Sequence, residues 1–176
     1  GIVKEGVKSI SMGVGIRAVK GEGTGYTYTE DLSIGKMMQA ARTAAAIADS
    51  GSGRGPAAIR ESRCEDHYPV TSATTEEPLG NKVAWIGEAG EAARLSDPAI
   101  TKVTVTLADS IRDIQIVTSD GRLLRDRRPM TSFSVSVVAE RNGNRQIGVS
   151  SGGGRMGPEY FAEIKTPRRH GMEAAR

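Results

Sequence analysis

The sequence predicts an α+β protein made of two-layer units, in which antiparallel sheets pack against helices. Three observations support this fold class. Apolar and polar residues alternate with a period of two in several short runs, a pattern typical of strands that bury one face. Two longer segments carry apolar residues at spacings of three and four, which indicates amphipathic helices. Glycine contributes 22 of the 176 residues, and these glycines cluster between the alternating runs, where turns and bulges are expected.

The first unit is expected to be a hairpin covered by one helix. Residues 10–18 alternate and predict a strand, and the turn-rich segment 20–25 leads into a second alternating run at 26–30. A helix is predicted from Ile34, with apolar residues at spacings of three and four, ending near Ser50. Its apolar side should lie on the hairpin.

A long segment without periodicity follows this helix. Between residues 50 and 78 the composition shifts to Gly, Ser, Pro, Thr and charged residues. Because a structureless loop of this length is uncommon inside a compact domain, we interpret it as a boundary between two units. The expected organisation is a first unit at 1–50, a connector at 51–79, a second unit at 80–165, and a basic tail without a pattern at 166–176.

The second unit is expected to be a helix followed by an antiparallel meander with one solvent-exposed face. The helix is predicted over 81–95, and Asp97-Pro98 ends it. Turn residues at 119–121 and 142–144 separate alternating runs, and a short helix starts near Glu159. The expected strands lie at 103–107, 114–118, 122–128, 133–139 and 146–150.

Composition excludes several classes of protein. Leu, Ile, Val and Phe supply only 34 of 176 residues, but the net charge is only +3, which favours a folded chain with a small core over a disordered one. No apolar run approaches the roughly 20 residues of a transmembrane helix. The single cysteine, Cys64, forms no internal disulfide and fits a reducing cytoplasm. The chain begins at Gly1 without a secretory signal or a methionine, so we expect a processed start or a piece of a longer protein.

Nucleotide-binding motifs are weak or missing. Residues 13–18 match the loose G-x-G-x-x-A pattern, but they lie in a predicted strand with no helix directly after them. Bulging or close backbone approach explains these glycines better than a dinucleotide site. No G-x-x-x-x-G-K-[ST] loop occurs in the sequence, which excludes nucleotide hydrolysis of that type.

A glycine-rich segment after the last predicted strand is the sharpest candidate site. It consists of Ser151, Gly152, Gly153, Gly154 and Arg155. Successive backbone N–H groups there can form a nest for a carboxylate or phosphate, with Arg155 as a bidentate partner. The alternative is a flexible turn with a solvated arginine.

The other candidate residues support no particular chemistry. His67 and His170 stand outside any H-E-x-x-H arrangement, and we expect both to be exposed. Cys64 and His67 suggest a nucleophile pair, but neighbours in an unpatterned segment are poorly held for catalysis. The arginines at 122–128 are interpreted as a solvated or ion-paired strand face, which makes nucleic acid an unlikely partner. These residues alone support a peptide- or protein-binding module.

Two stretches add a family resemblance. Residues 1–45 read GIVKEGVKSISMGVGIRAVKGEGTGYTYTEDLSIGKMMQAARTAA, and residues 119–161 read SDGRLLRDRRPMTSFSVSVVAERNGNRQIGVSSGGGRMGPEYF. Both resemble the TldD/PmbA metallopeptidases, especially the TldD branch, over roughly 1–50 and 80–161. The sequence resembles an N-terminal and central portion of such an enzyme.

The resemblance implies a cytoplasmic peptidase that takes unfolded peptides. It implies a heterodimer of a zinc-bearing TldD-like subunit with a TldE/PmbA-like subunit, or self-association. It also implies a zinc held by a histidine-glutamate-histidine motif and a distant cysteine, all beyond the region represented here. We therefore assign no catalytic and no metal residue in this chain and expect no zinc on it.

The residues and the resemblance together suggest how a peptide is held. An extended peptide binds sequence-tolerantly when it adds as a strand to a sheet edge. We predict that residues 146–155, with Ser151 to Arg155 as the site residues, border the peptide cleft. The alternative is a non-catalytic peptide-binding or partner subunit of the TldE/PmbA type.

Overall fold

The structure is a computed structural model, and it describes residues 3–48, 58–62 and 69–176. The chain divides into two compact units. One comprises Glu5–Ala57, and Ala58–Arg176 make up most of the other. Each unit combines sheet and helix, which confirms the predicted fold class. None of the helices in the described residues is long and apolar enough to cross a membrane.

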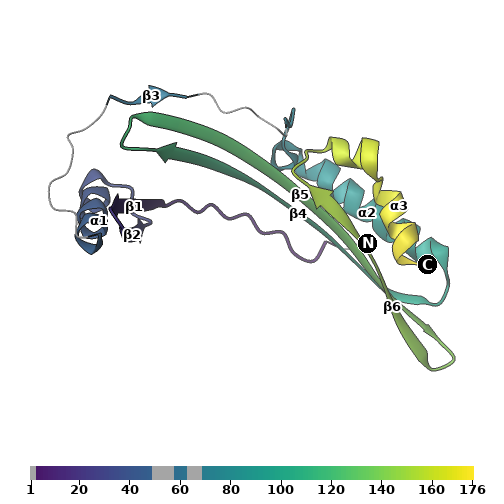
Figure 1. Cartoon of the computed structure of the whole chain (residues 1–176). Coiled ribbons are helices and arrows are strands. Elements are labelled where there is room, and N and C mark those ends of the chain that lie inside the picture. Colours follow the sequence, from purple (N-terminus) through teal and green to yellow (C-terminus); the bar gives the residue numbers. More distant parts are fainter. Residues whose placement is uncertain (1–2, 49–57, 63–68) are drawn as a thin grey trace. The chain divides into compact units, whose positions relative to one another are not determined.

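The first unit is a two-stranded hairpin with one helix (Figure 1). Strand β1 (Val14–Lys20) pairs antiparallel with β2 (Gly23–Thr29), from Val14 opposite Thr29 to Lys20 opposite Gly23. The hairpin was predicted correctly, but its first strand begins later than expected. The partner strand ends opposite Val14, so Ile10 and Met12 have no partner there and are exposed.

Helix α1 (Ile34–Ile47) lies against this hairpin, as predicted. The two elements approach so closely that a Cβ atom on Gly25 would lie 1.9 Å from the carbonyl oxygen of Ala44. The Thr27 hydroxyl donates a hydrogen bond to the carbonyl oxygen of Ala40 at 2.9 Å. Small residues on both elements therefore make the contact possible.

The second unit contains a sheet with three long antiparallel strands. They are β4 (Ile100–Val117), β5 (Arg122–Arg141) and β6 (Asn144–Gly154), and the short β3 (Arg60–Glu61) runs parallel to the start of β5.

The runs expected as separate strands at 103–107 and 114–118 are one strand in the structure. Asp109 interrupts the apolar alternation between them, and this polar residue favoured the prediction of two strands. It faces the helices and forms an ion pair with Lys82 at 2.6 Å. The strand therefore continues through a satisfied polar residue.

Pro129 lies inside β5, and the strand pairing explains why it is tolerated. The carbonyl oxygens of Gly121 and Leu123 accept hydrogen bonds from the backbone N–H groups of Arg60 in β3 and of Ser62 directly after it, so odd-numbered residues of β5 direct their backbone groups to that edge. The pairing with β6 begins only at Thr131. Pro129 falls between the two partners and removes no bond from the described ladders.

A helical layer covers one face of this sheet (Figure 1). Helix α2 (Leu79–Ser96) and helix α3 (Pro167–Ala174) lie side by side, preceded respectively by the 3₁₀ turn η1 (Thr74–Glu76) and the π-helical turn η2 (Tyr160–Ile164). Phe161 packs edge-on against Phe133, with ring centroids 5.1 Å apart. The buried core consists of Ala89, Ala93, Phe133, Val135, Val137, Tyr160, Phe161 and Ala174.

Helix α3 corrects the expectation of a tail without a pattern. Thr166 caps this helix by accepting a hydrogen bond from the backbone N–H of Arg169 at 3.2 Å, and Pro167 occupies its first position. Its buried side presents His170, Gly171 and Ala174. Because none of these is a large apolar residue, the sequence shows almost no hydrophobic periodicity there.

Small residues let α3 pack between β6 and α2. A Cβ atom on Gly148 would lie 2.0 Å from the carbonyl oxygen of Ala174, and one on Gly171 would lie 2.2 Å from that of Ala89. Both contacts are with backbone atoms, which cannot move aside without shifting a whole element. The position of α3 therefore depends on these glycines.

Replacing Gly171 by alanine should destabilise the protein. The added methyl group would overlap the α2 backbone, and such overpacking costs about 1–3 kcal/mol, which exceeds the helix-propensity gain of about 1 kcal/mol. The matched control is Gly87→Ala in α2, where a Cβ atom would meet nothing within 4 Å. Chemical denaturation should show a lower free energy of unfolding for Gly171→Ala and a slightly higher one for Gly87→Ala. Equal stabilities of the two variants would contradict this packing account.

Candidate functional site

The predicted site residues lie at the end of β6. Gly152 is opposite Phe133 and Gly154 is opposite Thr131 in the β5–β6 ladder, and Arg155 follows the strand. The segment is therefore neither a nest nor a flexible turn. Gly153 has a φ of +134°, and a Cβ atom there would lie 2.1 Å from the carbonyl oxygen of Thr131. Only glycine fits that position without strain.

The backbone of β6 has one paired edge and one open edge. Odd-numbered residues of β5 point to the edge shared by β3 and β6, so their partners Gly148, Ser150 and Gly152 complete the ladder. The alternate residues Val149 and Ser151 must direct their N–H and C=O groups the other way. No strand in the described part of the chain pairs with that outer edge.

The residues of β6 whose backbone groups point to this edge carry their side chains on the sheet face opposite the helices. Ile147 and Val149 are 67% and 61% exposed, which is unusual for large apolar residues in a strand. Small hydroxyl side chains dominate the rest of this face. They include Thr104, Thr106, Ser132, Ser134, Ser136 and Ser151.

Arg155 is held against the neighbouring strand. Its guanidinium donates to Asp126 Oδ1 at 3.1 Å and to the carbonyl oxygen of Arg127 at 2.9 Å. Asp126 also accepts a short hydrogen bond from Arg128. The hydrogen bond from Arg128, followed by the positive charges of Arg128 and Arg155, holds the pKa of Asp126 below its usual value.

A buried polar cluster lies directly behind β6 and was missed by sequence reasoning. His170 was expected to be exposed, but it is fully buried. Its Nδ1 atom lies 3.0 Å from Ser150 Oγ, and its Nε2 atom lies 2.9 Å from the Tyr160 hydroxyl. Lys165 donates to Ser150 Oγ at 2.9 Å and forms an ion pair with Glu173. These residues come from β6, from η2 and its end, and from α3, so no single sequence motif marks the cluster.

Burial controls the charge of His170. Desolvation, assisted by the positive charge of Lys165, lowers the pKa of His170 from 6.5 to about 4, although Glu173 opposes this shift. The hydrogen bond from Lys165 is the main cause that lowers the pKa of Glu173 to about 2. Burial also raises the pKa of Tyr160. At neutral pH the imidazole is therefore uncharged, and the cluster joins α3 to β6.

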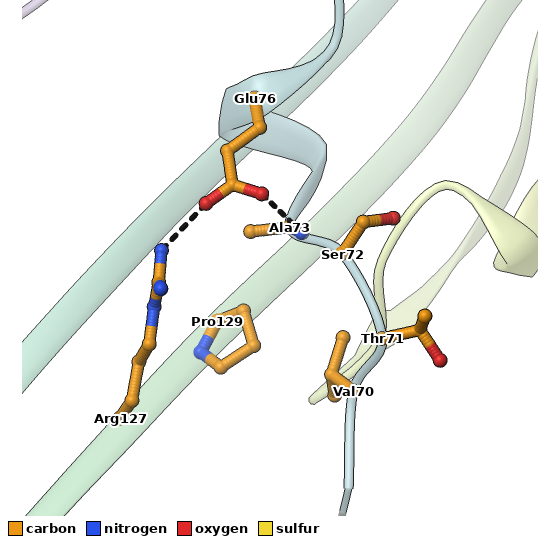
Figure 2. A pocket seen from close by; sticks show the side chains of 7 residues that line it. All are labelled: Val70, Thr71, Ser72, Ala73, Glu76, Arg127 and Pro129. Carbon is orange, nitrogen blue, oxygen red and sulfur yellow. Dashed lines mark hydrogen bonds and ion pairs between the residues drawn. The ribbon is translucent and has the colours of Figure 1, made fainter.

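A small pocket lies beside β5 (Figure 2), and none of its lining residues belongs to β6. It has a volume of about 130 Å³ and is lined by residues 70–73, Glu76, Arg127 and Pro129. Glu76 Oε1 lies 2.6 Å from an Arg127 nitrogen, and its other oxygen accepts from the backbone N–H of Ala73 at 3.4 Å. The opposite charges neutralise each other, so the pocket is weakly suited to a charged ligand.

The basic run at 122–128 forms an ion-paired strand face, as predicted. Each of its arginines lies beside a carboxylate. The pairs are Arg122 with Asp120, Arg125 with Glu61, Arg127 with Glu76 and Asp113, and Arg128 with Asp126.

The described residues do not fit a metal site. Among them, no group of three or more His, Cys, Asp and Glu side chains lies close enough to hold a metal ion. Both ring nitrogens of His170 already contact hydroxyl groups. The pair Cys64 and His67 lies outside the described residues. We therefore derive no metal-dependent step from this structure.

Acidification should destabilise the protein through His170. Because the folded-state pKa is depressed, the unfolded chain takes up a proton first as the pH falls below about 6.5, so stability falls with decreasing pH until about pH 4. Between pH 6.5 and 4.5 we expect a loss of about 2 kcal/mol in the free energy of unfolding. Urea unfolding of the wild type and of His170→Gln across this range measures the difference. A wild-type slope that persists in His170→Gln would assign it to another group.

Comparison with known proteins relates this fold to a family. Residues 74–176 match the PmbA/TldA metallopeptidase central domain, and residues 1–48 match the PmbA/TldA metallopeptidase domain 1. A metalloprotease TldD homologue from Haemophilus influenzae is 34% identical over 170 residues, covering 93% of this chain and 34% of that protein. A TldD homologue from Buchnera aphidicola is 33% identical over 161 residues, covering 92% and 33%.

A solved structure from Thermotoga maritima supports the same fold. That protein is described as a candidate modulator of a DNA gyrase, and it matches with a TM-score of 0.70 and 19% identity, over 94% of this chain and 36% of that chain. The chain thus spans about a third of the length of the relatives it matches. The two domain matches together place it in the PmbA/TldD metallopeptidase family, as the N-terminal and central domains.

Proposed function

We propose that this chain contributes the peptide-holding edge of a PmbA/TldD metallopeptidase. An unfolded peptide adds as a strand to the outer edge of β6. The observation that carries this proposal is the direction of the β6 backbone. Val149 and Ser151 present N–H and C=O groups away from β5, and no described strand pairs with them.

The surroundings of this edge suit a substrate of variable sequence. Main-chain hydrogen bonds give affinity without reading side chains. The exposed Ile147 and Val149 supply apolar contact, and the neighbouring serine and threonine side chains are small enough to accept different residues. The buried contacts of Ser150 and Gly152 with α3 and Tyr160 hold the strand in place behind the peptide.

The zinc site, the partner subunit and the cellular location of the proposed enzyme are inferred from the family. Bond cleavage requires a zinc site, and we assign that site to residues other than those described in this chain. A TldE/PmbA-like subunit, or a second copy, is the proposed partner in a cytoplasmic enzyme. A non-catalytic subunit would use the same β6 edge. The 33–34% identity to proteins named as TldD metalloprotease homologues favours the catalytic branch.

Proline substitutions on the outer edge should weaken peptide binding. Proline at Val149 or Ser151 removes one outward N–H group while leaving the ladder to β5 intact. Losing one such hydrogen bond costs roughly 1 kcal/mol, so we expect roughly fivefold weaker binding for each variant. Fluorescence anisotropy with a labelled, unfolded and uncharged peptide measures this affinity in the purified protein.

Alanine variants at the same positions provide matched controls. Val149→Ala and Ser151→Ala shorten the side chains but keep the backbone N–H groups, so they should bind the peptide nearly as the wild type does. Thermal unfolding should show that all four variants are folded. If each proline variant binds like its alanine control, the peptide does not add to this edge.

A further inference from the structure

The open face of the sheet carries a cluster of three arginines just beyond the end of β6. Arg112 on β4 lies directly opposite Arg128 on β5, so both side chains stand on the same face. Arg155 reaches this group from the end of β6 through its bond to Asp126. Asp126 shares the face of Arg128 because the two occupy positions i and i+2 of the same strand.

This arrangement concentrates positive charge. Like charges placed directly opposite each other destabilise an antiparallel pair, so Arg112 and Arg128 carry a cost in the free protein. One carboxylate, Asp126, serves both Arg128 and Arg155. Within the described residues, no carboxylate lies at ion-pair distance from Arg112. Among the three arginines, Arg112 is therefore the one beside which the described residues place no carboxylate.

Two of the three guanidinium groups are already oriented. The carbonyl oxygen of Arg127 and the Asp126 carboxylate position Arg155, whose side chain is only 23% exposed. Asp126 also orients Arg128 by accepting a hydrogen bond from it. Fixed guanidinium groups lose little conformational entropy on binding, and their planar forks match the geometry of a carboxylate.

The position relates the cluster to the proposed peptide edge. The β5–β6 ladder ends with Gly154 opposite Thr131, and Arg128 and Asp126 follow three and five residues further along β5. An extended peptide that continues past Gly154 therefore reaches Arg155 first. The cluster lies where a charged group near one end of the bound segment would arrive.

We propose that Arg112, Arg128 and Arg155 bind a carboxylate of the peptide held on β6, and so give the protein a preference for acidic peptides. The carboxylate comes from an Asp or Glu side chain or from the free C-terminus of the peptide. This peptide carboxylate provides Arg112 with the negatively charged partner that the described residues do not provide. This inference rests on the proposed function, because it takes the β6 edge as the place where the peptide lies.

Three matched peptides test the preference in the purified protein. The first is neutral and ends in an amide, the second replaces one Gln of it by Glu, and the third is neutral with a free C-terminal carboxylate. Fluorescence anisotropy should show that at least one carboxylate peptide binds roughly tenfold more tightly than the neutral one at low salt, and that salt reduces the difference. The carboxylate peptide that binds more tightly identifies the source of the charge.

Variants then assign this preference to the cluster. Arg112→Gln should reduce the preference roughly fivefold while leaving the neutral peptide unaffected, and Arg112→Lys should restore part of it. Arg112→Glu should abolish the preference without lowering the melting temperature, since it places opposite charges across the strands. The control Arg145→Gln removes an exposed arginine near the β5–β6 turn, paired with Glu140, and should leave the preference unchanged.

The outcomes separate this inference from the proposed function. Equal binding of all three peptides, with weaker binding by Val149→Pro, overturns the arginine site and leaves the peptide edge standing. A failure of every peptide to bind overturns both. Equal loss of preference in Arg112→Gln and Arg145→Gln means general surface charge and overturns the site. Arg112-dependent binding of a single-stranded oligonucleotide, without a preference among the peptides, also overturns it in favour of a phosphate ligand.

Discussion

The close packing of helix α3 against β6 and α2 is the constraint on which the second unit depends. Gly148 and Gly171 allow backbone to meet backbone at positions where a single methyl group would overlap. Between these contacts, the buried His170 joins Ser150 of the strand to Tyr160 of η2. An uncharged imidazole with both nitrogens satisfied can occupy this interior without a large desolvation cost. The same interactions thus hold the helical layer and the last strand of the sheet.

This packing also determines what β6 offers to other molecules. The inward positions of the strand are occupied by α3 and η2, and one backbone edge is occupied by β5. Other molecules can therefore reach only the outer edge of β6 and its outward face, which carries the exposed Ile147 and Val149. An open edge strand with apolar side chains promotes unwanted pairing between copies. A peptide or another polypeptide segment that adds to this edge would occupy these open backbone groups.

Charge is distributed unevenly along the long hairpin of β4 and β5. The arginines near its tip lie beside carboxylates, so their fields are largely local. Beside the end of β6, Arg112 and Arg128 stand opposite each other, and Asp126 pairs with both Arg128 and Arg155. The hairpin tip is thus neutralised within the chain, whereas the centre of the open face favours a negatively charged ligand. This difference separates the proposed carboxylate site from the rest of the basic surface.

The sequence alone determined the local features: the first hairpin, helices α1 and α2, and the family resemblance. These follow from periodicity, turn residues and quoted motifs, all of which act over short distances along the chain. The tertiary structure decided the continuity of β4, because Lys82 satisfies Asp109 from another element. It also decided the helical nature of α3, the burial of His170 and the open edge of β6. These features depend on contacts between residues far apart in sequence. Several of the contacting residues are glycines and serines, which add nothing to the hydrophobic periodicity of the sequence.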